Sequence, residues 1–275
     1  SYNYYPYFYY NSDMSKQALL NVNQLAARKA AAELEFAVKK VHSLDASKGG
    51  PDGYLKAIER RVEDIVFEEI EKFFQEDNYI SAQQGHVVNN SNVTWVLKPI
   101  DGTENFMNGY PHFAVSLCSM IDNVVTSAVI IDPIRREEFS SYGGGGADLN
   151  NNKIRCSMQN NLEESMLSYA KSFSDEEYEF EKSYKELAGQ NLYMRESGCL
   201  SLDLAYVGTG RLDGFWAFDT SLIDIAAGSL IAQEGGALVS NFNGDPKFIT
   251  GNNIVSAAPK IYKSVLKSIK PYFKG

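Results

Sequence analysis

Apolar residues recur at intervals of three and four positions in two long segments near the start of the chain. Residues 15–42 and residues 55–74 both follow this spacing, which is typical of helices that bury one face. Between them, residues 43–53 include Gly-Gly-Pro-Asp-Gly, a combination that favours a loop. The pattern therefore predicts two long amphipathic helices joined by a loop.

The hydrophobic pattern changes beyond residue 93, where short apolar runs separated by turn residues indicate strands. Residues 94–97 predict a short buried strand, and residues 113–120 and 124–131 predict a strand pair around Asp122-Asn123. Further on, strands and helices alternate. The expected strands are residues 212–218, 237–240 and 254–257, and the expected helices are residues 200–209, 221–233 and 260–269. Mixed elements with many antiparallel connections predict an α/β fold built as a layered sandwich.

The same pattern suggests how the chain is divided. No long linker interrupts residues 14–275, so we expect a single folded domain of two packed sub-domains that meet near residue 150. Residues 1–13 hold six tyrosines and one phenylalanine, and they match no targeting signal. They are interpreted as a leader or tag-like segment outside the domain, with an interaction arm as the alternative.

Composition and charge narrow the classes of partner. The chain of 275 residues has a net charge of −9, which weighs against direct nucleic-acid binding, because that normally needs a Lys/Arg-rich surface. No apolar run reaches the roughly 18 residues that suggest a membrane span. Its three cysteines are widely spaced, as expected for reduced thiols. These features predict a cytoplasmic protein with no membrane partner.

Two motifs carry most of the functional information. Residues 95–106 read Trp-Val-Leu-Lys-Pro-Ile-Asp-Gly-Thr-Glu-Asn-Phe, which resembles the signature W-V-x-D-P-I-D-G-T-x-N-F of the inositol monophosphatase family. The family's second signature, W-D-x-A-A-G, is similar to residues 223–228. Shorter matches at residues 111–116, 132–133, 202–206 and 213–215 follow in family order. The resemblance extends from about residue 18 to residue 266, and it favours the bacterial branch that includes a suppressor protein tied to ribosomal-RNA antitermination.

The resemblance implies a fold and a chemistry. Members of this family are five-layer αβαβα sandwiches of the inositol monophosphatase and sugar phosphatase type, usually homodimers, and are Mg²⁺-dependent phosphomonoesterases. Magnesium takes oxygen ligands and activates a water molecule. Mapped onto this chain, the family's metal ligands include Ile100, Asp101 and Asp224. Thr103 matches the residue that orients the water, and Ser197 lies at a substrate-binding position.

The chain departs from the family pattern at its acidic residues. Lys98 replaces the Asp that bridges two metals, Gln84 replaces the Glu of a G-E-E-like loop, and Ala217 replaces a Glu that contacts substrate hydroxyls. Of the family's four metal-binding carboxylates, this chain therefore keeps Asp101 and Asp224. An amide, Gln84, and an ammonium, Lys98, replace the other two. Two carboxylates left close together repel each other, and an ammonium between them removes that repulsion. We therefore expect Lys98 Nζ to bridge Asp101 and Asp224, with no cofactor.

Three functions are consistent with these residues. The first is a degenerate phosphatase that has lost its activity and acts by binding a protein partner or a phosphorylated ligand. Phosphate would bind at Lys98 and at the backbone N–H groups of Gly102 and Thr103, where a helix starts. The second is an active inositol-1-monophosphatase-type hydrolase with altered metal use, with Mg²⁺ held by Asp101, Asp224 and the Ile100 carbonyl. The third is an accessory protein of transcription antitermination or RNA processing.

Overall fold

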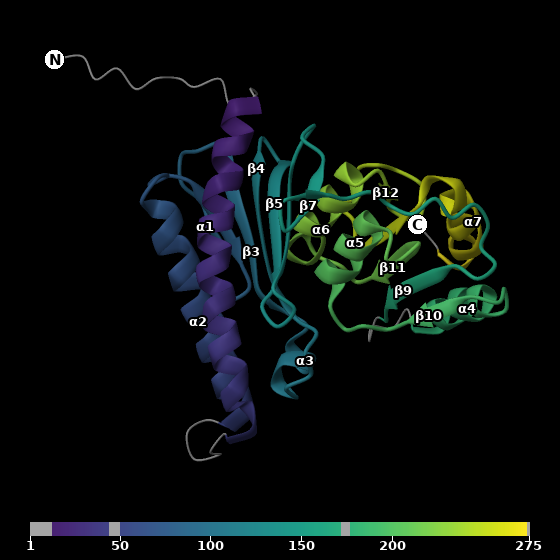
Figure 1. The fold of residues 1–275 in the computed structure, drawn as a ribbon, viewed down its shortest axis with the longest axis horizontal. Coiled ribbons are helices and arrows are strands. Elements are labelled where there is room, and N and C mark those ends of the chain that lie inside the picture. The colour runs from purple at the N-terminus through teal and green to yellow at the C-terminus, as the bar shows by residue number, and fades with distance from the viewer. Residues whose placement is uncertain (1–12, 44–49, 172–176, 274–275) are drawn as a thin grey trace.

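A computed structural model describes residues 13–43, 50–171 and 177–273 (Figure 1). The leader expected at residues 1–13 lies outside the described residues, except for Asp13, which begins the first helix. No helix in the described parts of the chain is long and apolar enough to cross a membrane.

Two long helices form the first layer. Helix α1 (Asp13–Ala37) continues into a 3₁₀ helix (Val38–Ser43), and α2 (Gly50–Glu71) packs beside α1. Residues 50–53, expected in a loop, instead form the first turn of α2. Proline is tolerated in a first helical turn, because the N–H group that it lacks would have no partner in the helix there.

The second layer is an eight-stranded sheet, covered on one face by α1 and α2 (Figure 1). Its strand order is β2-β1-β3-β4-β5-β6-β7-β8; β1 and β3 run parallel and all other neighbours run antiparallel. The strands are β1 (Asn78–Ser81), β2 (Gly85–Val87), β3 (Val93–Asp101), β4 (Ala114–Ile121), β5 (Val124–Asp132), β6 (Glu137–Tyr142), β7 (Ala147–Leu149) and β8 (Asn152–Lys153).

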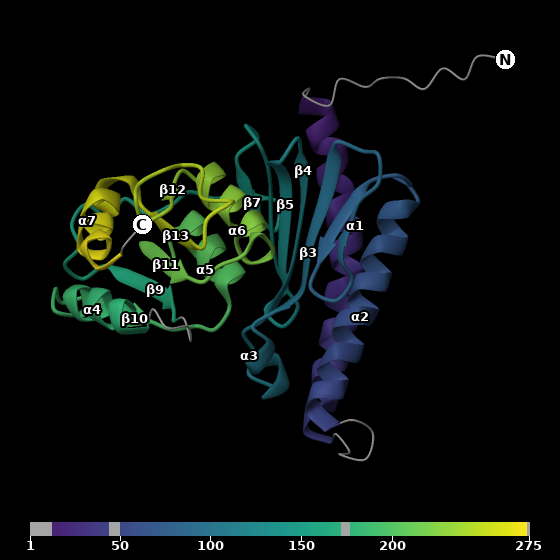
Figure 2. The same ribbon diagram turned by 180° about the vertical axis from the view of Figure 1, so that it is seen from behind.

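Three further layers follow. Helices α5 (Leu200–Thr209) and α6 (Leu222–Glu234) lie between the first sheet and a five-stranded sheet of order β10-β9-β11-β13-β12, as Figure 2 shows from behind. Its strands are β9 (Met166–Ala170), β10 (Tyr193–Arg195), β11 (Gly214–Phe218), β12 (Leu238–Ser240) and β13 (Asn253–Ala257). Helices α4 (Glu177–Ala188) and α7 (Pro259–Ile269), followed by a 3₁₀ turn (Lys270–Tyr272), form the outer layer. The expected layered αβαβα sandwich is confirmed. The chain leaves the first sheet after β8, while the expected sub-domain boundary near residue 150 stays a prediction.

Strand β3 explains how the site is positioned. Successive side chains of a strand point to opposite faces of its sheet. Trp95 and Leu97 are buried in the core beneath α1 and α2, whereas Val96 packs in the core shared with α5 and α6. Lys98 has the same parity as Val96, so its side chain faces the inner helices. The strand predicted at residues 94–97 is therefore longer than expected, and its extension carries Lys98 and Asp101.

Candidate functional site

The end of β3 meets the start of α6, and each element supplies one aspartate. Asp101 is the last residue of β3. Gly102 follows with φ 84°, and a Cβ there would lie 3.0 Å from the His112 carbonyl oxygen, so the turn requires glycine. Asp224 lies in the first turn of α6, where its Oδ2 accepts hydrogen bonds from Ser221 N at 2.8 Å and Ser221 Oγ at 2.7 Å. This capping box fixes the Asp224 carboxylate.

Lys98 joins the two carboxylates. Its Nζ lies 2.8 Å from Asp101 Oδ1 and 2.6 Å from Asp224 Oδ1. The side chain of Asp101 is 1% exposed, and those of Lys98 and Asp224 are each 19% exposed. The contact expected from the sequence is therefore present. It pairs two acidic groups of the chain with one of its own cations in a largely buried place.

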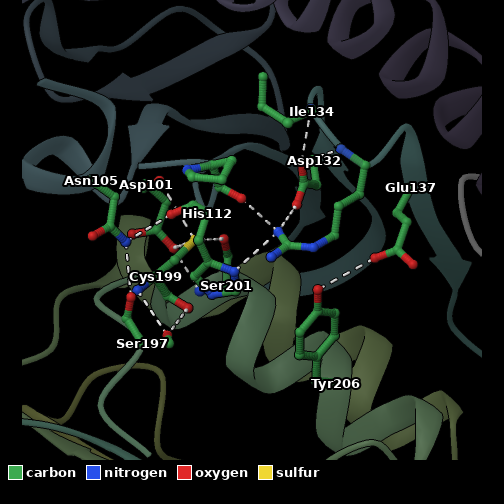
Figure 3. Close-up of polar contacts among 12 residues, drawn as sticks. Asp101, Asn105, His112, Asp132, Ile134, Glu137, Ser197, Cys199, Ser201 and Tyr206 are labelled. Carbon is green, nitrogen blue, oxygen red and sulfur yellow. Dashed lines mark hydrogen bonds and ion pairs between the residues drawn. The ribbon is translucent and has the colours of Figure 1, made fainter. Parts of the chain in front are cut away.

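The second oxygen of Asp101 is also fully engaged. Asp101 Oδ2 accepts a hydrogen bond of 2.6 Å from the backbone N–H of Ser201, in the first turn of α5 (Figure 3). The Cys199 thiol lies 3.3 Å from the same oxygen. A buried carboxylate without partners would cost several kcal/mol. Here the strand, the helix start and Lys98 together satisfy it.

Electrostatics keep this ion pair charged. Burial favours the neutral form of Asp101, but the Lys98 charge and the Ser201 hydrogen bond outweigh it and hold the pKa of Asp101 below its usual range. Burial likewise favours neutral Lys98, but the charges of Asp101 and Asp224 outweigh it and raise the pKa of Lys98. Lys98 and Asp101 are therefore both ionised at neutral pH.

The loop after β1 lies against α2. The carboxylate of Glu63, which is fully buried, accepts hydrogen bonds from the backbone N–H groups of Gln83 at 2.8 Å and Gln84 at 3.0 Å. Gln83 Nε2 donates to Glu59 Oε2 at 2.6 Å, whereas Gln84 Nε2 contacts Asp64 Oδ1 at 3.4 Å. Burial raises the pKa of Glu59, while Gln83 and the nearby Lys98 charge partly offset this effect.

The role expected for Gln84 at the site stays a prediction. Gln83 is the loop glutamine that contacts the surroundings of Lys98, and the Gln84 side chain turns away towards solvent. The sequence interpretation did not include Glu63 in the site. Its signal was present, because Glu59 and Glu63, four residues apart, interrupt the buried face of α2 beside Ile58 and Val62.

The residues expected to bind an anion are arranged differently from the expectation. The helix that starts at Thr103, α3 (Thr103–Met107), has only five residues, and Thr103 Oγ1 donates to Glu104 Oε2 at 3.0 Å. The Lys98 ammonium faces two carboxylates, which would repel an incoming anion. Phosphate binding at Lys98, Gly102 and Thr103 stays a prediction that this geometry does not favour.

Of the expected substrate-binding positions, Ser197 is half-buried and Ala217 is buried. Ser197 Oγ donates to Asp203 Oδ2 at 2.7 Å. The Ser197 carbonyl accepts a hydrogen bond of 2.8 Å from Asn105 Nδ2 (Figure 3). Burial raises the pKa of Asp203 to about 7, an effect that its serine hydroxyl partners only partly offset. Ala217 is fully buried in β11. A substrate role for Ser197 and Ala217 stays a prediction.

A glycine run elsewhere in the fold holds a carboxylate. The loop between β6 and β7, Gly143–Gly146, donates the N–H groups of Gly144 and Gly146 to the two oxygens of Glu234, each at 2.8 Å. Backbone N–H groups arranged in this way form an anion-binding nest. The nest binds the carboxylate at the end of α6.

The donors at Lys98 do not suit a magnesium ion. Within residues 13–43, 50–171 and 177–273, no group of three or more His, Cys, Asp or Glu side chains is arranged to hold a metal. Magnesium demands oxygen ligands in near-octahedral geometry. At this place, an ammonium already contacts both aspartates. The Ile100 carbonyl would be the remaining donor that the family resemblance supplies.

Comparisons with known proteins give the family. Residues 15–272 match the model of the inositol monophosphatase family, and the chain belongs to this family. A protein of Pseudomonas aeruginosa described as Nus factor SuhB is 34% identical over 264 residues, covering 93% of this chain and 97% of that protein. These matches fit the antitermination-associated branch that the sequence resemblance indicated.

Solved structures of similar proteins have the same fold. The extragenic suppressor protein suhB from Bartonella henselae has a TM-score of 0.86 and 29% identity, covering 92% of this chain and 98% of that chain. An inositol monophosphatase from Anabaena has a TM-score of 0.79 and 27% identity, covering 93% of this chain and 96% of that chain. The layered fold is thus shared with proteins described both as suppressors and as phosphatases.

Proposed function

We propose that this protein is a non-hydrolytic member of the inositol monophosphatase family that acts by binding a protein partner. The observation that supports this proposal most strongly is the position of Lys98 Nζ, 2.8 Å from Asp101 and 2.6 Å from Asp224. The family's chemistry needs a divalent cation at clustered carboxylates. In this chain, a side-chain ammonium takes that place.

Electrostatic repulsion from the Lys98 ammonium is the physical reason why a divalent cation is disfavoured at this place. A divalent cation about 4 Å from an ammonium is repelled by on the order of 8 kcal/mol at an effective dielectric constant of about 20. Magnesium would therefore have to displace Lys98 from two carboxylates that hold it in a partly buried place. The amide of Gln83, where the family has a carboxylate loop, adds no negative charge to offset this repulsion.

The kind of partner is inferred from the net charge of the chain and from the proteins that resemble it. Proteins described as Nus factors resemble this chain along nearly their whole length, so we propose an accessory role in transcription antitermination. The net charge of −9 suits a basic protein surface better than RNA. We place the protein in the cytoplasm, where transcription takes place, and expect a homodimer, as is usual in the family.

The competing function is an active phosphomonoesterase that holds one metal with Asp101, Asp224 and the Ile100 carbonyl. That arrangement requires Lys98 to leave the two carboxylates. The family relationship itself favours this alternative, because a solved neighbour is described as an inositol monophosphatase. The two functions differ in one measurable property, namely whether Mg²⁺ binds to the unmodified chain.

Reversion of the acidic positions tests the proposal. Hydrolysis of inositol 1-phosphate is measured with and without Mg²⁺ for the wild type, Lys98→Asp/Gln83→Glu and Lys98→Asp/Gln84→Glu. We expect no Mg²⁺-dependent turnover by the wild type and a gain in the Gln83 double variant that exceeds the gain in the Gln84 double variant. Turnover by the wild type that rises with Mg²⁺ would overturn the proposal and favour the active phosphatase.

A further inference from the structure

The glycine loop between β6 and β7 is held in place by contacts other than the carboxylate that it binds. The N–H groups of its first and third glycines donate to the carbonyls of Thr126 at 2.9 Å and Tyr142 at 2.8 Å. Those of the second and fourth glycines donate instead to the two oxygens of Glu234. Two of the four N–H groups therefore fix the loop on the eight-stranded sheet, and the other two are presented to an anion.

The backbone of this loop requires glycine. Gly144 has φ 86° and Gly146 has φ 74°, both in the left-handed region that residues with a side chain rarely adopt. A Cβ at Gly145 would clash with the Tyr142 ring. Because sequence and sheet contacts fix this conformation, the donors of Gly144 and Gly146 stay arranged for an anion when Glu234 leaves.

Two cations lie beside these donors. A Cβ at Gly146 would lie 3.6 Å from Lys153 Nζ and 3.8 Å from Arg155 Nη1. Lys153 pairs with Asp148 at 2.9 Å. Arg155 is exposed and, within the described residues, its guanidinium donates only to the Ile154 carbonyl, so no carboxylate neutralises it. An arginine without a counter-ion beside paired backbone donors is an arrangement that suits phosphate.

Glu234 is a modest ligand for this place. Its side chain is half-buried, and among the residues that the structure describes its carboxylate accepts hydrogen bonds from the glycine loop alone. It carries one charge and has two oxygens. A phosphate monoester carries a charge of roughly −1.5 to −2 at neutral pH and has three strong acceptor oxygens. Such a group can accept from both glycine N–H groups and from the Arg155 guanidinium at once.

We propose that the glycine loop, together with Arg155 and Lys153, is a binding site for a phosphate group, and that Glu234 occupies it when no ligand is bound. The phosphate belongs either to inorganic phosphate or to a monoester. The incoming anion displaces the Glu234 carboxylate, which turns towards water.

The site is separate from the Lys98 centre. Glu234 is the last residue of α6, and Asp224 lies in its first turn, ten residues earlier. A helix rises 1.5 Å per residue, so the two positions are roughly 15 Å apart. Figure 1 shows β7, which follows the glycine loop, beside α6. Phosphate binding here does not depend on the function proposed for the chain.

An internal competitor weakens the apparent affinity by a predictable factor. Hydrogen bonds to a partly solvated carboxylate favour the closed nest by about five- to ten-fold. A ligand that binds only the open nest has its apparent dissociation constant raised by the same factor of about five to ten. Removing the Glu234 carboxylate should therefore tighten phosphate binding by that factor. Removing the Arg155 guanidinium should weaken it about ten-fold, since charge-assisted hydrogen bonds are lost.

Nuclear magnetic resonance of the full chain labelled with ¹⁵N-glycine tests this. The amide shifts of Gly144 and Gly146 are followed while sodium phosphate or methyl phosphate is added at pH 7, with sodium chloride of equal ionic strength as the blank. The proteins are the wild type, Glu234→Ala and Glu234→Ala/Arg155→Gln. Glu71→Ala is the matched control, because Glu71 is an exposed carboxylate at the end of α2, which packs on the other face of the sheet from α6.

We expect phosphate to shift both amides, with a midpoint about five- to ten-fold lower in Glu234→Ala than in the wild type. The added Arg155→Gln change should raise the midpoint again about ten-fold, and Glu71→Ala should match the wild type. The lower midpoint of the two phosphate compounds assigns the site to free phosphate or to an ester.

Three results would overturn the proposal. One is that sodium chloride shifts these amides as much as phosphate does. Another is that Glu234→Ala and the wild type have the same midpoint. The third is that phosphate shifts the Gly102 amide but neither loop glycine, which would place the anion at the Lys98 centre. If Glu234→Ala does not fold, Glu234→Gln, which also removes the charge, takes its place in each comparison.

Discussion

At two places in this molecule, a charged side chain of the protein itself occupies a position where a ligand could bind. At the end of β3, the Lys98 ammonium lies between Asp101 and Asp224. At the glycine loop after β6, the Glu234 carboxylate lies on the N–H groups of Gly144 and Gly146. The first region supplies a cation to buried anions, and the second supplies an anion to backbone dipoles near the surface.

The two regions differ in what is left behind when the charged side chain, Lys98 or Glu234, is removed. Without Lys98, a carboxylate that is 1% exposed keeps its charge but loses its counter-ion. Without Glu234, the glycine N–H groups can turn to water. The cost of an unpaired group depends chiefly on its burial. The Lys98 centre should therefore respond strongly to substitution, and the glycine nest weakly.

The largest effect is expected from Lys98→Met, which keeps the length of the side chain and removes its charge. Breaking a buried ion pair by removing one partner typically costs about 3–5 kcal/mol, so we expect a loss of that order in the free energy of unfolding. Urea denaturation measures it. Lys39→Met is the matched control, because Lys39 pairs with Glu35 at 3.9 Å on the surface and is 68% exposed. An equal loss in both variants would contradict the difference between buried and exposed pairs.

The stability difference between the wild type and Lys98→Met should also depend on pH. Folding lowers the pKa of Asp101, so its contribution to stability is present above the unfolded value of about 3.9 and is lost as the pH falls through the folded value. Folding raises the pKa of Lys98, so its contribution is present below about 10.4 and is lost as the pH rises through the folded value. The stability gap between the wild type and Lys98→Met should therefore be widest between about pH 5 and 9.

On the acid side that gap should narrow as the pH falls, because the variant relieves its unpaired, buried carboxylate by binding a proton. Urea denaturation of both proteins at pH 3, 4, 5 and 7 checks this. A gap that stays constant across these values would mean that Lys98 acts through packing rather than through charge.

The smallest effect is expected from Glu234→Gln. The amide has one acceptor oxygen for two N–H donors, but Glu234 is only partly buried and water can replace the lost bond. We expect a loss of about 1 kcal/mol in the free energy of unfolding. Thermal or urea denaturation beside Lys98→Met gives the ratio directly. A loss as large as that of Lys98→Met would remove the distinction between the two regions.

Much of the fold was predictable because its long elements have clear periods. The two helices of the first layer and strands β4 and β5 follow three- to four-residue and continuous apolar patterns. The last two strands of the first sheet, β7 (Ala147–Leu149) and β8 (Asn152–Lys153), are too short to show any period. The start of α2 at Gly50 was missed, because Gly-Pro-Asp-Gly favours a loop in isolation, although a helix tolerates proline in its first turn.

The site was predictable where it follows from strand alternation and from a substituted motif. Lys98 has the parity of Val96, and the motif places Asp101 three residues later. The contacts of the loop at Gln83 were not predictable in this way, because they depend on how the chain returns to Glu63 on α2. Glu234 and Gly144 are 90 residues apart, and no local pattern indicates their contact.

Divalent-cation binding tests most directly whether Lys98 takes the place of a metal. Mn²⁺ bound to the protein is measured by electron paramagnetic resonance for the wild type, Lys98→Asp and Lys98→Asp/Asp224→Asn. If the ammonium occupies the cation position, the wild type binds no Mn²⁺ at this site. Lys98→Asp then gains a bound ion, which the added Asp224→Asn change weakens. Mn²⁺ bound by the wild type, and lost in Asp224→Asn alone, would contradict the substitution of a lysine for the metal.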